Sequence, residues 1–258
     1  MMNSVASGLL QEILSRKPEP DVKRLRAALG RSGLPDRVPF MELFADPEIM
    51  ASILRKPARL LTDEGLNASE KKERLSLIIR FYEMLGYDYV PATVDGLEVD
   101  FPRIPGRDPS PSLNRGVRKW AVEGEGAITT WEGSKAFPWP DPEGFRLTSL
   151  EHVRDHLPAG MGLVCNFSGV LEWVMWLMGF RGFFQSVYRQ PGLVDAMFEK
   201  VGELFLPAFR LAAKVKGLTA FFVGDDWGFK NGTMISPRMM REKVFPWHRR
   251  FAEIAHSH

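Results

Sequence analysis

The hydrophobic positions along this chain predict helices that alternate with short apolar strands. The clearest helical pattern ends at Leu85, and its apolar residues Leu75, Ile78, Ile79 and Tyr82 recur at three- and four-residue intervals. Helices are predicted at residues 21–29, 46–54, 67–85, 149–156, 170–178, 183–187, 193–216 and 236–254. Runs typical of strands lie at residues 37–42, 87–94, 160–165 and 220–223.

Capping residues support several of these helix boundaries. Asp21 and Gly30 flank the first predicted helix, and Ser236 followed by Pro237 begins the last. Pro207 predicts a kink inside the longest helix.

The order of strands and helices predicts an α/β fold of the (β/α)8 TIM-barrel type. A strand, a helix and a second strand form the βαβ unit of a parallel sheet, and the pattern contains about four such units. Residues 95–148 interrupt it with a stretch rich in Pro, Gly and Trp, which we interpret as an inserted loop with a hairpin. A β-like run lies inside this stretch at residues 127–131. We expect residues 1–258 to form a single barrel-type domain that lacks its C-terminal half.

The charge balance points away from nucleic acids and membranes. The chain carries 34 basic and 32 acidic residues, so its net charge is only +2. Residues 1–10 lack the basic and apolar regions of a secretory signal, and the longest apolar stretch is too short to span a bilayer. A single cysteine, Cys165, excludes a disulfide framework within the chain and a Cys-based zinc cluster. These features predict a cytoplasmic protein.

Polar residues follow each predicted strand. Glu42 closes the first, Thr93 and Asp95 follow the second, Asn166 and Ser168 follow the third, and Asp225 with Asp226 follows the fourth. Parallel α/β sheets bind ligands at the carboxyl ends of their strands, so these ends are the candidate site.

The pair Asp225-Asp226, followed by Trp227, is the strongest candidate. Neighbouring residues of an extended chain point to opposite sides, so we expect one carboxylate to face the site and the other to support a turn. A carboxylate there could bind a cation, accept a proton or orient a substrate. The alternative is an Asp-rich turn without a functional role.

Other residues that can carry chemistry have plainer alternatives. His152 with His156, and His256 with His258, have spacings that can hold a metal, but no HExxH pattern accompanies them and a solvated helix or chain end explains both pairs. Cys165 is typical of a small core residue. An aromatic and apolar stripe is either core or the lining of a pocket for a flat or tetrapyrrole ligand: Trp173, Trp176, Leu177, Phe180, Phe183 and Phe184.

Several segments together resemble the uroporphyrinogen decarboxylase superfamily, which includes cobalamin-dependent methyltransferases. They are DRVPF at 36–40, GYDYV at 86–90, YRQP at 188–191, GDDWG at 224–228 and the helix from ISPR at 235–238 through FPW at 245–247. GEGAITTW at 124–131 and FPWP at 137–140 are similar to a decarboxylase-like branch.

The resemblance implies a (β/α)8 barrel, often a homodimer, with its site at the carboxyl ends of the strands. It also implies that the chain stops after its fourth barrel helix, so that the zinc ligands of the methyltransferases would have to come from residues beyond His258. Tyr188 matches the active-site tyrosine of the decarboxylases, and Asp226 replaces their Ser or Thr. Their arginine-rich segment, which binds substrate carboxylates, is absent. Glu42 and Asp226 would repel the eight carboxylates of uroporphyrinogen.

Three hypotheses follow. The first is a methyltransferase-like protein that binds a corrinoid, a tetrapyrrole or a small methylated substrate. The second is uroporphyrinogen decarboxylase, which needs no cofactor. The third is a non-catalytic half-barrel that works with a complementing chain. In the first, the predicted catalytic residues are Asp225, Asp226, Tyr188 and Glu42, and the predicted substrate-binding residues are Asn166, Ser168 and Trp227. No metal ligand is assigned, and corrinoid and zinc are expected only if residues beyond the chain end are supplied.

Overall fold

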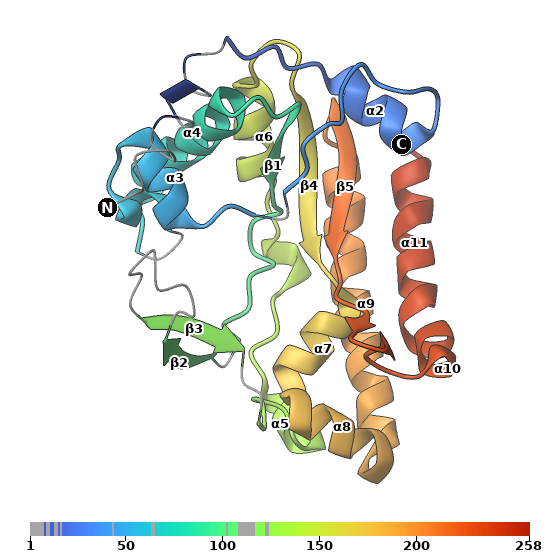
Figure 1. Cartoon of the computed structure of the whole chain (residues 1–258). Coiled ribbons are helices and arrows are strands. Elements are labelled where there is room, and N and C mark those ends of the chain that lie inside the picture. Colours follow the sequence, from blue (N-terminus) through green and yellow to red (C-terminus); the bar gives the residue numbers. More distant parts are fainter. Residues whose placement is uncertain are drawn as a thin grey trace. The chain divides into compact units, whose positions relative to one another are not determined.

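The computed structural model (Figure 1) describes residues 17–42, 44–62, 65–101, 103–107, 117–121 and 124–258, with positions 8, 11, 12 and 15. These residues form two compact units. Unit 1 comprises the described residues within Met1–Asp95, Arg146–Asn166 and Lys214–Phe222. Unit 2 comprises those within Gly96–Phe145, Phe167–Ala213 and Val223–His258.

A three-stranded sheet gives the fold its α/β character. Its strands are β1 (Tyr89–Ala92), β4 (Gly162–Ser168) and β5 (Leu218–Gly224), in the order β1-β4-β5. β1 runs parallel to β4, with Tyr89 opposite Gly162, and Figure 1 shows β4 and β5 pointing the same way. Three of the four predicted strands are therefore confirmed, and the incomplete barrel of the (β/α)8 type stays a prediction.

The predicted strand at residues 37–42 is wrong. This segment is irregular, and Pro39 has no N–H to donate to a sheet. At Glu42 a side chain takes the place of a neighbouring strand. The Tyr89 hydroxyl accepts from the Glu42 N–H at 2.9 Å and donates to the Glu42 carbonyl at 2.9 Å.

The first predicted helix of unit 1 begins where its cap predicts. The helices of unit 1 are α2 (Val22–Gly30), α3 (Pro47–Leu54), η1 (Ala58–Leu61), α4 (Ala68–Met84) and α6 (Thr148–Asp155). Asp21 caps α2 by accepting from the Lys23 N–H at 3.0 Å. The predicted C-cap is displaced by one residue, because Gly30 is the last helical residue and Arg31 takes the left-handed conformation with φ 51°.

Unit 2 contains the predicted hairpin, but not at residues 127–131. The hairpin consists of β2 (Arg103–Arg107) and β3 (Val117–Ala121), which pair antiparallel. Residues 127–131 lead instead into the short helix α5 (Trp131–Ala136), because the Thr130 side chain caps it by accepting from the Gly133 N–H at 3.0 Å. A 3-10 turn, η2 (Pro142–Gly144), follows.

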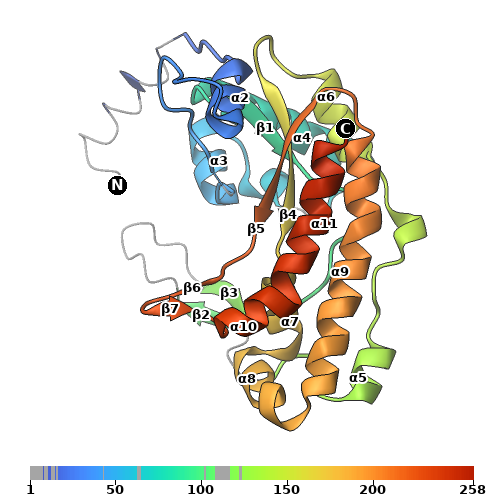
Figure 2. The same cartoon turned by 90° about the vertical axis from the view of Figure 1, so that its right-hand side faces the viewer.

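The remaining elements of unit 2 form a helical layer. They are α7 (Val170–Met178), α8 (Phe180–Arg189), α9 (Pro191–Ala213), the two-residue strands β6 (Gly228–Phe229) and β7 (Gly232–Thr233), α10 (Pro237–Met239), the π-helical turn η3 (Met240–Val244) and α11 (Phe245–His256). Ser236 caps α10 as predicted, accepting from the Met239 N–H at 3.2 Å. Figures 1 and 2 both show α11 alongside α9.

Stacked aromatic rings hold this layer together. Phe209 of α9 lies between Phe167 and Phe251, with ring centroids 3.9 and 4.3 Å away. Trp173 and Phe183 of the predicted stripe are buried, which confirms the core interpretation for them, whereas Phe184 is partly exposed. Cys165 of β4 is also buried, as predicted for a core residue.

No helix within the described part of the chain is both long enough and apolar enough to cross a membrane.

Candidate functional site

A buried carboxylate lies directly after β5. The Asp225 side chain is 1% exposed. Its Oδ1 accepts from the Glu172 N–H at 3.0 Å, and its Oδ2 accepts from the Leu171 N–H at 3.4 Å. These two amides lie in the first turn of α7, so Asp225 caps that helix from a distant point in the sequence.

Gly169 makes this remote cap possible. It occupies the N-cap position of α7, where it has no side chain to accept a hydrogen bond. A Cβ added to Gly169 would lie 1.8 Å from the Asp225 carboxyl carbon. Glycine therefore leaves the space that the Asp225 carboxylate occupies, and the two residues depend on each other.

His248 of α11 is the third partner of Asp225. Its Nε2 lies 2.8 Å from Asp225 Oδ2, and a carboxylate oxygen only accepts, so Nε2 carries the proton in this pair. The imidazole packs edge-on against the Trp227 indole, with centroids 4.9 Å apart. A carboxylate that fixes the orientation and tautomer of an imidazole is a recurrent arrangement in acid–base sites.

Glu172 has the most strongly altered acidity at this site. Burial raises its pKa to about 7, and repulsion from Asp225 and then from Asp226 adds to the effect. A backbone hydrogen bond from Gly169 acts in the opposite direction. A carboxyl group with this pKa exchanges protons near neutral pH, which is the property of an effective general acid or base.

The two neighbouring aspartates differ in exposure and in partners. Asp225 is buried, whereas Asp226 is exposed and its Oδ1 accepts from the Gly228 N–H at 3.0 Å. Asp226 therefore supports the turn into β6. The indole N–H of Trp227 is buried, and it has no hydrogen-bond partner among the residues that the structure describes.

The other predicted site residues are spread over both units. Glu42 and Asn166 belong to unit 1, where the Tyr87 hydroxyl lies 3.3 Å from Glu42 Oε1. Ser168 ends β4 in unit 2 and is half-buried. Tyr188 is 87% exposed on α8. The structure thus brings Asp225 and Trp227 together around His248, while the roles assigned to the other residues stay predictions.

Two residues of this cluster were not among the predicted site residues. Glu172 could have been recognised as a carboxyl group in an otherwise apolar helix, three residues after a glycine. His248 gives no such signal, because its partner Asp225 lies 23 positions earlier in the chain.

The described residues do not fit a zinc–thiolate centre. Burial raises the pKa of the Cys165 thiol, which disfavours the thiolate that binds zinc. Within the described ranges, no group of three or more His, Cys, Asp and Glu side chains is arranged to hold a metal ion.

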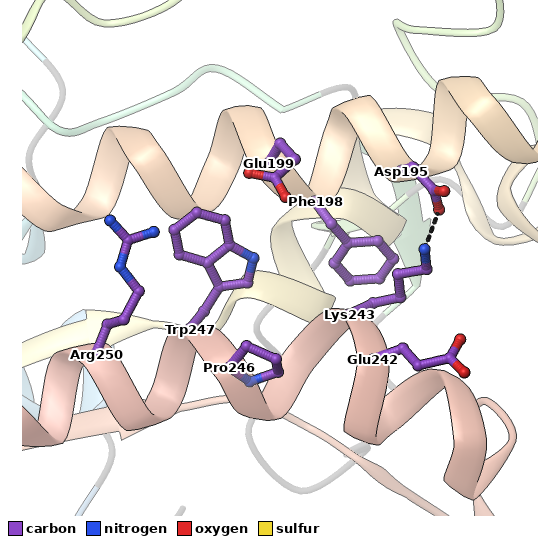
Figure 3. A pocket seen from close by; sticks show the side chains of 8 residues that line it. All are labelled: Asp195, Phe198, Glu199, Glu242, Lys243, Pro246, Trp247 and Arg250. Atoms are coloured by element: carbon purple, nitrogen blue, oxygen red, sulfur yellow. Dashed lines mark ion pairs between the residues drawn. The ribbon is translucent and has the colours of Figure 1, made fainter.

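A separate pocket of about 250 Å³ lies between α9 and the start of α11 (Figure 3). Its two cationic side chains are already engaged. Lys243 Nζ lies 2.7 Å from Asp195 Oδ1, and Arg250 Nη1 lies 3.0 Å from Glu203 Oε1. The Arg250 guanidinium also lies 4.6 Å from the centroid of the Trp247 ring. These contacts explain how α9 and α11 pack, and we assign the pocket no ligand.

No family model matches the chain, and no curated protein matches it either. The chain is similar in fold to a methyltransferase. That solved structure, a methyltransferase from Methanosarcina mazei, is 15% identical, with a TM-score of 0.56 over 92% of this chain and 68% of the other. At this identity the likeness concerns the fold alone.

Proposed function

We propose that this chain takes part in methyl transfer to or from a small methylated substrate, as a methyltransferase-like protein of the uroporphyrinogen decarboxylase superfamily. The shared fold with the Methanosarcina mazei methyltransferase supports this proposal. The observation that carries it is the raised pKa of Glu172, about 7. This carboxyl group interacts with Asp225, which directly follows β5.

Methyl transfer from an oxygen, nitrogen or sulfur atom leaves an electron pair on that atom. In the proposed reaction, a nucleophilic acceptor attacks the methyl carbon, the bond from methyl to heteroatom breaks, and Glu172 donates its proton to the leaving heteroatom. The products are the methylated acceptor, the protonated leaving group and the Glu172 carboxylate. Proton donation of this kind contributes roughly 10²–10⁴-fold to a rate.

Asp225 and His248 position Glu172 for this step, and they stay hydrogen-bonded to each other. Asp225 holds the amide of Glu172 at 3.0 Å and His248 Nε2 at 2.8 Å, so it fixes both groups relative to the first turn of α7. Burial of Glu172, together with the negative charge of Asp225, keeps the Glu172 proton bound near neutral pH. Solvent then returns a proton to Glu172 after each turnover.

The same charges disfavour uroporphyrinogen as a substrate. Asp225, Asp226 and Glu172 place three carboxyl groups at one strand end. A ligand with many carboxylates would meet repulsion there. We therefore expect a neutral or cationic methylated compound, with a corrinoid as the methyl acceptor or donor.

The test is a methyl-transfer assay with chemically reduced cobalamin as the acceptor. Small O-, N- and S-methylated compounds are offered one at a time, and methylcobalamin is followed by its absorbance. The wild-type chain should methylate cobalamin with at least one compound, and Glu172→Gln should slow the reaction by ~10²-fold or more. Glu242→Gln, which alters an exposed carboxylate in the pocket of Figure 3, is the matched control and should keep the wild-type rate.

Two outcomes would overturn the proposal. One is a folded wild-type chain, verified by circular dichroism, that transfers no methyl group from any compound. The other is an equal loss of rate in the Glu172 and Glu242 variants. Release of carbon dioxide from uroporphyrinogen would instead select decarboxylation.

A further inference from the structure

Two imidazole rings stack at the end of α6 in unit 1, where His156 directly follows the helix as its C-cap residue. The ring centroids of His152 and His156 lie 4.3 Å apart, and the ring planes differ by 22°. A spacing of four residues places both side chains on one face of the helix. The same spacing lets two histidines on a helix bind one metal ion.

Hydrogen bonds leave a nitrogen lone pair on His156. Its Nδ1 lies 2.8 Å from the His152 carbonyl oxygen. A carbonyl only accepts, so Nδ1 is the donor and Nε2 of the neutral ring carries the lone pair that a metal ion takes. This backbone contact also fixes the orientation of the ring, as the second hydrogen bond of a metal-binding histidine commonly does.

His152 has a weak and replaceable contact. Its Nε2 lies 3.4 Å from Ser76 Oγ of α4, which is at the limit of a hydrogen bond. Ser76 has a closer partner in the Lys72 carbonyl, at 3.1 Å. A metal ion that takes the His152 lone pair therefore displaces little, and the Ser76 hydroxyl stays beside it as an oxygen neighbour.

We propose that His152 and His156 together bind one divalent transition-metal ion of the kind that prefers imidazole nitrogen, such as Zn²⁺, Ni²⁺ or Cu²⁺. Two ring nitrogens come from the protein and water completes the coordination. The bound ion would join two turns of α6 and stabilise unit 1. The site is independent of the proposed methyl transfer.

The experiment is calorimetric titration of the full chain, freed of metal with EDTA, with NiCl₂ or ZnCl₂ at about pH 7.5, where neutral imidazole dominates. We expect one ion per chain and a higher Tm in its presence. His152→Asn and His156→Asn should each weaken binding by at least about tenfold. Mg²⁺, which prefers oxygen ligands, should not bind.

The chain supplies its own matched control in His256 and His258. The double variant His256→Asn/His258→Asn should bind the metal as the wild type does, which separates α6 from the end of α11. Loss of binding in this variant with retention in His156→Asn would overturn the proposal, and so would the absence of saturable binding to the wild type. Because His156 is exposed, its replacement leaves the core intact, so this outcome can be interpreted.

Discussion

Two aspartates are equally buried, one at the amino end of a strand and the other at the carboxyl end of another, and they have different partners. Asp88 directly precedes β1, and Asp225 directly follows β5. Both side chains are 1% exposed. In parallel α/β folds the carboxyl ends of strands carry chemistry, whereas the amino ends contribute to stability.

Their partners differ in one decisive property. Asp88 Oδ1 accepts from Arg24 at 3.0 Å, from Arg37 at 3.1 Å and from the Asp21 N–H at 2.8 Å. Arginine stays charged at every physiological pH, so this cluster has one protonation state. It ties the start of α2 to the amino end of β1.

Asp225 instead lies beside a carboxyl group with a raised pKa. Its partners are two backbone amides and the imidazole of His248, and its charge helps to raise the pKa of Glu172 to about 7. The comparison teaches that burial alone does not identify a functional carboxylate. A neighbouring carboxyl group with a pKa near neutral, here Glu172, makes the site a candidate for chemistry.

The largest expected effect is the loss of stability in Asp88→Asn. Removal of this charge leaves the guanidinium groups of Arg24 and Arg37 without their buried partner, which should cost about 3–5 kcal/mol in free energy of unfolding. Urea denaturation followed by circular dichroism measures it.

Asp36→Asn is the matched control for this prediction. Asp36 also pairs with Arg24, at 2.6 Å, but its side chain is 68% exposed. Solvent and salt screen such a pair, so its loss should change stability far less. Equal losses in the two variants would contradict the structural role assigned to the Asp88 cluster.

The next effect concerns the dependence of Asp225 on Gly169. Gly169→Ala forces a Cβ against the Asp225 carboxylate and should cost ~1–3 kcal/mol, because the α7 amides lose their acceptor. Asp225→Ala should cost a similar amount through the lost cap.

A double-mutant cycle makes this prediction specific. In the Asp225→Ala background the added methyl group meets no carboxylate, so Gly169→Ala should cost much less than it does alone. Additive losses, measured by urea denaturation, would show that Gly169 and Asp225 do not act together.

Much of this fold could be predicted from the sequence, because local signals agree with the tertiary structure. Asn67 and Glu70 form a capping box at the start of α4, and the apolar spacing of that helix matches its buried face. The alternation rule also separated Asp225 from Asp226 correctly. The strand predicted at residues 37–42 is wrong because the Tyr89 hydroxyl forms hydrogen bonds with the N–H and the carbonyl of Glu42. No local sequence pattern reveals this contact.

The helix that carries His248 could be predicted from the sequence, but the contact of His248 with Asp225 could not. The π-helical turn Met240–Val244 precedes α11, and such a turn contains one residue more than an α-helical turn. One extra residue rotates the following helix face by about 100°. Pro246 accounts for the irregularity, because it has no N–H to bond the Glu242 carbonyl four residues earlier. Val244, Trp247 and Phe251 nevertheless form one buried stripe with His248 beside it. The helical pattern does not reveal the partner Asp225, which lies 23 positions earlier in the chain.

A smaller effect is the pH dependence contributed by Glu172. Its pKa rises from 4.5 in the unfolded chain to about 7 in the folded one, so its contribution to stability is present below pH 4.5 and is lost as the pH rises through 7. Glu172→Gln lacks this loss. At alkaline pH the Glu172→Gln variant should therefore be more stable than the wild type. Because Glu172 is half-buried, solvent screening limits this increase in the free energy of unfolding to about 1 kcal/mol, or ~2–4 °C in Tm.

Thermal melts of both chains between about pH 5 and 8.5 check this prediction, because the unfolded and folded chains protonate Glu172 differently within that window. The difference in Tm between Glu172→Gln and the wild type should grow with pH. A constant difference would mean that Glu172 titrates normally and would remove it from the proposed chemistry.

The smallest effect distinguishes the two neighbouring aspartates by their influence on Glu172. Asp226 contributes less than Asp225 to the raised pKa of Glu172. Asp226→Asn keeps an acceptor for the Gly228 N–H and so preserves the turn, yet it removes one negative charge. The pKa of Glu172, followed by carboxyl carbon NMR, should fall slightly in Asp226→Asn and further in Asp225→Asn. If the Asp226 variant shifted the titration more than the Asp225 variant, the exposed carboxylate would be the one that tunes the site.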